Sequence, residues 1–219
     1  MFLPVNLNLK GRNCLVVGAG SVAEKKISSL LSTGAKIFVV ARAISPSIEK
    51  LKGKKFLRLF KREFRPDDLK NKFLVIVATH NKKVNNSIAN LCRGRNIIVN
   101  SVDSVKNSDF IFPAYFSRGD LVVAISTNGK SPTLAVKIRN DLKKYFGNEF
   151  KGFVREVGYL RRYIMREIKS EQNRKYLMSK MLEEVNMLKL TKNKSINVVR
   201  EKFRQLIKNH ARTGFRAKS

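Results

Sequence analysis

The chain has 219 residues, 43% of them hydrophobic, and carries 46 Lys and Arg residues against 16 Asp and Glu, for a formal net charge of +30. This length suits one α/β domain with a smaller addition, and the absence of any apolar run near about eighteen residues argues against a membrane-spanning helix. The charge favours polyanionic partners such as nucleic acid, an anionic membrane surface or an acidic small molecule, although a lysine-rich surface set by genome composition is the simpler explanation.

The first 150 residues alternate short apolar runs with helical patterns, which is typical of βαβ units on a parallel sheet. Helices are expected to follow most of the strands, and the apolar run at 73–78 is typical of a strand buried on both faces. We expect strands at 13–17, 36–40, 56–60, 73–78 and 97–99, and helices at 21–32, from Pro46 onward and at 84–93.

The alternation ends near residue 109. Two extended runs, 109–114 and 121–125, flank a short polar turn and predict an antiparallel pair added at the sheet edge. A polar loop at 126–131 leads into a helix, and beyond Phe146 the periodicity is helical only. We expect the last twenty or so residues, which are basic, to fray. The fold class predicted is therefore α/β: a Rossmann-like parallel sheet with an added antiparallel strand pair, then a smaller all-helical region.

A glycine-rich turn follows the first predicted strand, where Gly18-Ala-Gly20-Ser-Val-Ala23 begins a helix. In nucleotide-binding βαβ units the first glycine allows the tight turn and the second lets the backbone approach a pyrophosphate. The small third residue lets helix and strand pack closely. The pyrophosphate then lies at the positive end of the helix dipole. The strand, turn and helix, with a second strand at the right distance, predict a dinucleotide site.

The second predicted strand ends in Ala41-Arg42-Ala43, where a typical NAD site has Asp or Glu for the ribose hydroxyls. An arginine at this position favours a 2′-phosphate and hence NADP. Alternatively, Arg42 is a solvated strand-end residue and backbone groups near Ala43 hold the ribose. The sequence leaves both cofactors open.

Further polar groups lie where an open α/β sheet binds ligands, beyond the carboxyl ends of its strands. Asn100 and Asp103 end the fifth predicted strand, and Asp103 is a candidate general base, although an Asp after a strand is commonly a turn residue. The loop 126–131 combines a glycine, hydroxyls and a lysine at a helix N-terminus, and is either an anion site or an ordinary cap. His80 follows the fourth strand, where a lone histidine is typically a surface loop residue.

The two cysteines and the start of the chain favour a cytoplasmic protein. Cys14 and Cys92 lie in apolar patterns, so we expect reduced core residues rather than a disulfide or metal pair. The first residues lack a basic leader followed by an apolar stretch, so no signal peptide is expected. No Cys/His cluster has the spacing of a metal site, and we expect no structural zinc.

Several segments match one family in order, among them Leu3-Pro-Val5, Leu9-Lys-Gly-Arg12, Leu30-Leu-Ser-Thr-Gly-Ala35, Ala78-Thr79, Val84-Asn85 and Cys92-Arg93. Four further segments complete the match. They are Leu15-Val-Val-Gly-Ala-Gly-Ser-Val-Ala-Glu-Lys-Lys26, Val99-Asn-Ser-Val-Asp103, Phe110-Ile-Phe-Pro-Ala114 and Ala124-Ile-Ser-Thr-Asn-Gly-Lys-Ser-Pro132. The chain thereby resembles the precorrin-2 dehydrogenases, the amino-terminal part of siroheme synthases, over roughly residues 1–145. Two departures are His80, where small polar or acidic residues are common, and Ala19, in place of a frequent middle glycine. The resemblance does not include the methyltransferase domain of the larger siroheme synthases.

The resemblance implies oxidation of precorrin-2 to sirohydrochlorin with NAD as hydride acceptor, NADP not being excluded. It implies an anionic tetrapyrrole as substrate, a likeness of Asp103 to the family's catalytic aspartate, and a homodimer. The implied segments are an NAD-binding domain at 1–112, a dimerisation and substrate-loop segment at 113–147 and a basic helical domain at 148–219. Predicted cofactor contacts are Gly18, Ala19, Gly20, Ser21, Val22, Ala41, Arg42, Ala43 and Thr79. Predicted substrate contacts are Asn100, Ser126, Asn128, Gly129, Lys130 and Ser131.

Three alternatives remain. The first is a bifunctional enzyme that also inserts ferrous iron, as a second substrate, to make siroheme. Another is a dinucleotide-sensing regulatory or nucleic-acid-binding protein, for which basic helices around Arg161, Arg162 and Arg166 are the argument. The last is a family member whose role has drifted to tetrapyrrole or metal binding. The main interpretation includes no specific nucleic-acid partner and no membrane insertion.

Overall fold

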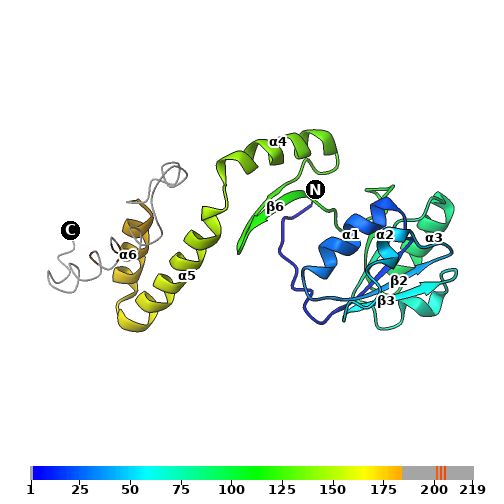
Figure 1. Ribbon diagram of the computed structural model, residues 1–219, viewed down its shortest axis with the longest axis horizontal. Helices are drawn as coiled ribbons and strands as arrows, with labels where there is room; N and C mark the ends of the chain where they lie inside the picture. Colours follow the sequence, from blue (N-terminus) through cyan, green and yellow to red (C-terminus); the bar gives the residue numbers. More distant parts are fainter. Residues whose placement is uncertain (1, 184–200, 202, 204, 206–219) are drawn as a thin grey trace. The chain divides into compact units, whose positions relative to one another are not determined.

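The computed structural model describes residues 2–183 and residues 201, 203 and 205. The chain forms two compact units, Met1–Phe112 and Pro113–Ser219 (Figure 1). The first unit carries a parallel sheet with its helices, and the second carries a hairpin followed by helices. Each unit is described by itself.

The first unit is built on a five-stranded parallel sheet with the strand order β3-β2-β1-β4-β5. Each crossover is a helix or a short turn of helix, as a parallel sheet requires. The strands are β1 (Asn13–Val17), β2 (Lys36–Ala41), β3 (Leu57–Lys61), β4 (Leu74–Val77) and β5 (Ile98–Ser101). The helices are α1 (Ser21–Leu31), α2 (Pro46–Glu49), the 3-10 turn η1 (Pro66–Leu69) and α3 (Lys82–Arg93). The predicted strands and helices of this unit are confirmed to within a few residues at their ends.

Two apolar layers enclose the sheet. On one face Val16, Ile37 and Ile76 pack with Ile27 of α1 and with α2. On the other face the alternate strand residues pack with α3 and η1. All four residues of β4 are buried, which confirms that the apolar run is a strand buried on both faces.

The cysteines lie on opposite faces of this sheet. Cys14 packs in the layer of α1 and Cys92 in the layer of α3, and both thiols are free and fully buried. Burial raises the pKa of Cys14 to about 11, and burial, with the charge of Asp109, raises that of Cys92 to about 12. Both thiols therefore stay protonated, as expected of core residues.

The second unit begins with an antiparallel hairpin of β6 (Ala114–Arg118) and β7 (Leu121–Ile125). The prediction of a strand at 109–114 is wrong in position, because the hairpin's first strand begins only at Ala114. Asp109 instead turns back to β5, where its carboxylate accepts a 2.9 Å hydrogen bond from the Val99 amide. The pair also forms a separate two-stranded sheet and does not extend the parallel sheet.

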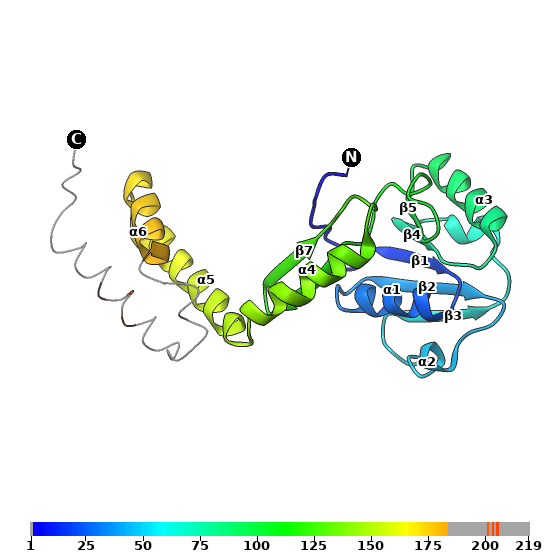
Figure 2. The ribbon, with the colours of Figure 1, turned by 90° about the horizontal axis from the view of Figure 1, so that it is seen from above.

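Three helices follow the hairpin: α4 (Pro132–Tyr145), α5 (Glu149–Glu167) and α6 (Glu171–Glu183). The helix α4 lies along the hairpin in both views (Figures 1 and 2). A separate core joins Phe150, Phe153 and Leu160 of α5 with Phe203, and the rings of Phe150 and Phe153 meet edge to face. The helical prediction holds to Glu183. The rest of the predicted helical region, with the last twenty or so residues that were expected to fray, lies mostly outside the described residues. No helix in the part of the chain that the structure describes is long and apolar enough to cross a membrane.

Candidate cofactor and active site

The carboxyl ends of β1, β2, β3 and β4 surround a cavity of about 770 Å³. Such a crevice is where open α/β sheets bind their ligands. Its floor is the turn after β1, and its walls are the segments that follow β2, β3 and β4. Its lining residues are Val17, Gly18, Ala19, Gly20, Val40, Ala41, Arg42, Ala43, Ile44, Ser45, Arg62, Glu63, Phe64, Ala78, Thr79, His80, Asn81 and Val84.

The glycine turn is shaped by close backbone contact with β4. Gly18 has φ +108°, and a Cβ built there would collide with the carbonyl oxygen of Ala78. Its amide donates a 2.9 Å hydrogen bond to the Val40 carbonyl, which ties the turn to β2. Only glycine readily adopts this positive φ angle and can lie so close to the Ala78 carbonyl. Gly18 itself lines the crevice.

The N-terminus of α1 fits a pyrophosphate. Its N-cap is Gly20, which provides no side-chain cap for the amides of the first turn. By contrast, α2, α3 and α4 are capped by the side chains of Ser45, Asn81 and Ser131. Uncapped first-turn amides and the helix dipole are what a phosphate group needs, and here they border the crevice.

Seven of the nine predicted cofactor residues line the crevice. They are Gly18, Ala19, Gly20, Ala41, Arg42, Ala43 and Thr79. The other two, Ser21 and Val22, are exposed at the start of α1 and do not line the cavity. Their backbone amides belong to the uncapped first turn, so the contact they can offer is through the main chain.

Two ion pairs border the crevice on the side of β2 and β3. The Arg42 guanidinium lies 2.5 Å from the Glu63 carboxylate, and both side chains are largely exposed. The Arg62 guanidinium forms two hydrogen bonds, of 2.5 and 2.8 Å, with Asp68 of η1. Residue spacing does not reveal Glu63 or Arg62 as site residues, because their place beside Arg42 depends on β3 lying next to β2.

Asp103 follows β5 and is held by two side chains. Ser101 Oγ donates a 2.6 Å hydrogen bond to one carboxylate oxygen, and Asn85 Nδ2 donates a 3.0 Å hydrogen bond to the other. Asn85 also donates to the Thr79 carbonyl at 3.1 Å and accepts from the Thr79 hydroxyl at 2.5 Å. Thr79 lines the crevice, so this chain of hydrogen bonds connects the carboxylate to the crevice wall.

These contacts keep Asp103 ionised. Partial burial raises its pKa, but the hydrogen bonds from Ser101 and Asn85 and the charge of Lys82 outweigh burial, and the net pKa lies below its ordinary value of 3.8. Asp103 as a residue is exposed. At neutral pH it is therefore a charged, accessible proton acceptor whose orientation is set by its neighbours.

Asn100 lies in surroundings that differ from the sequence-based expectation, whereas His80 lies where the sequence predicts it. Asn100 is buried, and its amide donates to the Phe110 carbonyl at 2.9 Å, so it fixes the segment after β5 rather than facing solvent. His80 is exposed, as expected of a loop residue, yet it lines the crevice beside Gly20. Asn85, completely buried between Thr79 and Asp103, was not selected because its role appears only in three dimensions.

The loop 126–131 belongs to the second unit and is ordered by its own hydrogen bonds. The Ser126 hydroxyl accepts from the Asn128 amide at 3.1 Å, and the Thr127 hydroxyl accepts from the Ser131 amide at 2.9 Å. Asn128 and Gly129 both have positive φ, of 51° and 81°. Lys130 at the end of this tight turn is exposed. The loop thus presents a lysine beside the start of α4, whose side-chain cap is Ser131.

Comparison with known proteins gives consistent family relationships. Residues 5–114 match the family described as "Putative NAD(P)-binding", and residues 118–145 match "Sirohaem biosynthesis protein central". A siroheme synthase of Psychromonas ingrahamii is 43% identical over 142 residues, which are 65% of this chain and 30% of that protein. The chain thus spans less than half of such siroheme synthases.

Two relatives match over nearly their whole length. The precorrin-2 dehydrogenase of Priestia megaterium is 32% identical over 201 residues, covering 91% of this chain and 98% of the relative. The solved structure of SirC, a precorrin-2 dehydrogenase, superposes with a TM-score of 0.76 at 32% identity, covering 94% of this chain and 100% of SirC. The fold and the order of its elements are therefore shared with that structure.

Proposed function

The chain belongs to the precorrin-2 dehydrogenase family, and from this membership and the crevice we propose that it oxidises precorrin-2 to sirohydrochlorin with NAD as the hydride acceptor. The observation that carries the proposal is the arrangement at the carboxyl edge of the sheet. An ionised Asp103 is joined through Asn85 and Thr79 to the wall of a crevice with an uncapped helix N-terminus.

The residues fit the two parts of the reaction. Dehydrogenation removes one hydride and one proton from the macrocycle, breaking two bonds to hydrogen and forming one double bond. The nicotinamide, when bound, accepts the hydride and its electron pair. Asp103 accepts the proton and passes it to water, which returns the carboxylate to its charged form. Ser101 and Asn85 keep the accepting oxygens oriented throughout.

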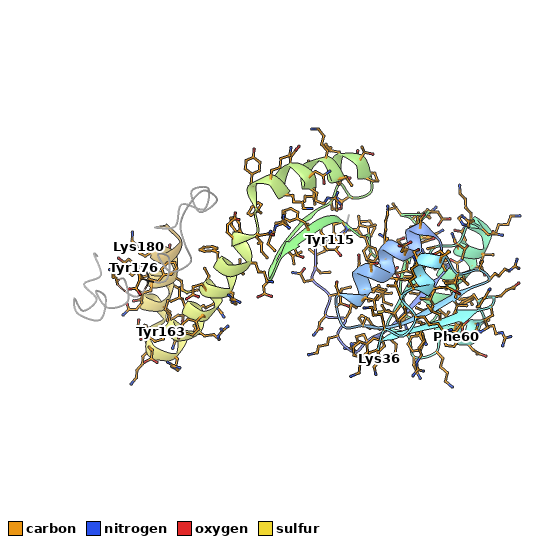
Figure 3. All side chains as sticks on the ribbon, in the orientation of Figure 1. Lys36, Phe60, Tyr115, Tyr163, Tyr176 and Lys180 are labelled. Atoms are coloured by element: carbon orange, nitrogen blue, oxygen red, sulfur yellow. The ribbon has the colours of Figure 1, made fainter. Side chains whose placement is uncertain are left out.

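An anionic tetrapyrrole also suits the charge of the chain. The net charge of +30 attracts a substrate with several carboxylates, and Lys130 beside the start of α4 offers a local cation. We expect residues 126–131 to bind the substrate and residues 113–147 to take part in dimerisation. The helices of the second unit carry the exposed side chains of Tyr145, Tyr159 and Tyr176, of which Tyr176 is labelled in Figure 3, and such side chains are available to a homodimer contact.

Iron insertion and a cytoplasmic location stay predictions from the sequence. In the described residues no group of three or more His, Cys, Asp and Glu side chains could hold a metal ion. If this chain inserts iron, we expect Asp103 to serve as the base for the pyrrole protons, with iron as a substrate.

The direct test of the proposed base is Asp103→Asn. We expect the rate of precorrin-2 oxidation to fall by about 10²–10⁴-fold, the usual contribution of a positioned general base. Binding of the reduced nucleotide, followed by its fluorescence, should stay unchanged because Asp103 does not line the cavity. An unchanged oxidation rate in the folded variant would remove Asp103 from the mechanism.

A further inference from the structure

The end of β2 lacks the acidic residue that holds the ribose in a typical NAD site. Ala41 ends the strand, and the next residue is Arg42, which lines the crevice with Ala43. A free arginine at this point favours the 2′-phosphate of NADP. The cofactor preference therefore depends on whether the Arg42 guanidinium is free.

The neighbouring strand supplies a carboxylate at the same place. β3 lies parallel to β2, and Ala41 is in register with Lys61. The chain then turns through Arg62 to Glu63, whose carboxylate oxygen Oε1 lies 2.5 Å from Arg42 Nη2. Both side chains line the crevice, so the ion pair borders the cavity itself.

The second arginine of this wall, Arg62, is paired with a different carboxylate. Arg62 forms two hydrogen bonds with Asp68, and its side chain is less exposed than that of Arg42. Bidentate arginine–carboxylate pairs are among the stronger polar contacts, so Arg62 is held away from a ligand phosphate. In this wall of the crevice each guanidinium is thus paired with a carboxylate.

We propose that Glu63 is the cofactor-specificity residue of this enzyme and selects NAD over NADP. The proposal rests on the proposed function and deepens it. Glu63, in the segment that follows β3, replaces the carboxylate that usually ends β2. It pairs with Arg42 and still has lone pairs to accept a hydrogen bond from a ribose hydroxyl. A 2′-phosphate at that position would meet the negative charge of Glu63 and an arginine already neutralised.

The test compares the dissociation constants of NADH and NADPH, measured by nicotinamide fluorescence on the whole chain. The unaltered protein should bind NADH more tightly. Glu63→Gln should raise the affinity for NADPH relative to NADH by about tenfold, because it removes the repulsion and frees Arg42. The double variant Glu63→Gln with Arg42→Ala should lose that gain, because the gain requires the freed guanidinium.

A matched control separates this effect from the loss of one negative charge. Glu171 on α6 forms an exposed ion pair with Lys175 at 2.8 Å and does not line the crevice. Glu171→Gln makes the same charge change and should leave the NADH-to-NADPH ratio unaltered.

Failure of the Glu63 assignment and failure of the proposed function give different results in this experiment. A native preference for NADPH, or an unchanged ratio in Glu63→Gln, would overturn the assignment of Glu63 while leaving the dehydrogenase proposal standing. Failure of the folded protein to bind either nucleotide would contradict the proposed function and this inference together.

Discussion

Asn85 has no exposed surface, and its amide joins the segments that follow β4 and β5. One amide nitrogen donates to both the Thr79 carbonyl and the Asp103 carboxylate. The amide oxygen accepts from the Thr79 hydroxyl. A side chain used in this way sets the position of the carboxylate without touching a ligand. We therefore regard Asn85 as a positioning residue for Asp103.

Replacement of Asn85 by Ala tests this role. It leaves buried polar groups without partners, which should lower the free energy of unfolding by about 1–3 kcal/mol. It also removes a hydrogen bond that lowers the pKa of Asp103. The acidic limb of the pH–rate profile, which needs charged Asp103, should therefore move to higher pH. A stability loss without a shift of that limb would mean that Asn85 is only structural.

The neighbouring Asn86→Ala provides the control for this measurement. Asn86 is exposed, and its side-chain oxygen accepts a 2.6 Å hydrogen bond from the side-chain amide of Asn107. It should leave the pH–rate profile in place.

Single residues differ in how far the sequence reveals them. Gly18 and Gly20 are found from spacing, because the chemistry of a strand–turn–helix unit is local. Glu63 and Asn85 are not, because their partners lie 21 and 18 positions away in the chain. Their contacts follow from the strand order β3-β2-β1-β4-β5, which residue spacing does not provide.

At the scale of elements, the 3-10 turn η1 owes its position to Asp68. Its carboxylate accepts from the Arg65 amide at 2.8 Å and pairs with Arg62, so it both caps the turn and fixes the wall of the crevice. Burial raises the pKa of Asp68, but the contacts with Arg62 and the Arg65 amide outweigh it. The net pKa lies below the ordinary value of 3.8.

Asp68→Asn should lower the free energy of unfolding by about 1–2 kcal/mol at neutral pH, through the lost cap and charge-assisted hydrogen bonds. Because the folded pKa is depressed, this stabilisation is complete above the unfolded pKa and is lost as pH falls through the folded pKa. Denaturant unfolding of both proteins against pH should show the difference shrinking in acid.

The exposed neighbour Asp67 provides the comparison for that experiment. Asp67→Asn should change stability by no more than about 0.5 kcal/mol at any pH. A difference between wild type and Asp68→Asn that persists at low pH would contradict a role for the charge.

The loop before α4 makes a separate prediction. If Lys130 binds a substrate carboxylate, Lys130→Ala should raise KM for the tetrapyrrole by about threefold to tenfold at low salt, and less at high salt. Steady-state rates at two ionic strengths measure this. Lys143→Ala removes the same charge at the other end of α4 and should have little effect. Equal KM values for the two variants would exclude Lys130 from substrate binding.

Elements with a strong apolar period are predicted well, and irregular segments are not. The strands of the parallel sheet and α3 follow directly from their patterns. The run 109–114 is extended and apolar, yet it is not a hairpin strand. Phe110 and Phe112 pack into the core of the first unit, and Asp109 bonds to β5. The same pattern serves for packing as for strand pairing, so periodicity does not distinguish them.

The chain as a whole is strongly basic, and three of its carboxylates make specific contacts after the parallel strands. The excess is +17 in residues 1–150 and +13 in residues 151–219. Among 16 acidic residues, Glu63, Asp68 and Asp103 follow the carboxyl ends of β3 and β5, near the crevice or in contact with residues of its wall. These three carboxylates each have a local cation or hydrogen-bond donor as a partner, while the excess of basic residues over the chain favours an anionic substrate.

The central claim is nucleotide-dependent oxidation of precorrin-2. It is tested most directly by anaerobic incubation of the purified protein with enzymatically generated precorrin-2 and NAD or NADP. The visible spectrum is recorded before and after ferrous iron is added. We predict that the sirohydrochlorin spectrum grows with NAD and more slowly with NADP, and faster siroheme formation than in an iron-only control would add chelatase activity. A spectrum that does not respond to either nucleotide, with the protein folded, would contradict the account.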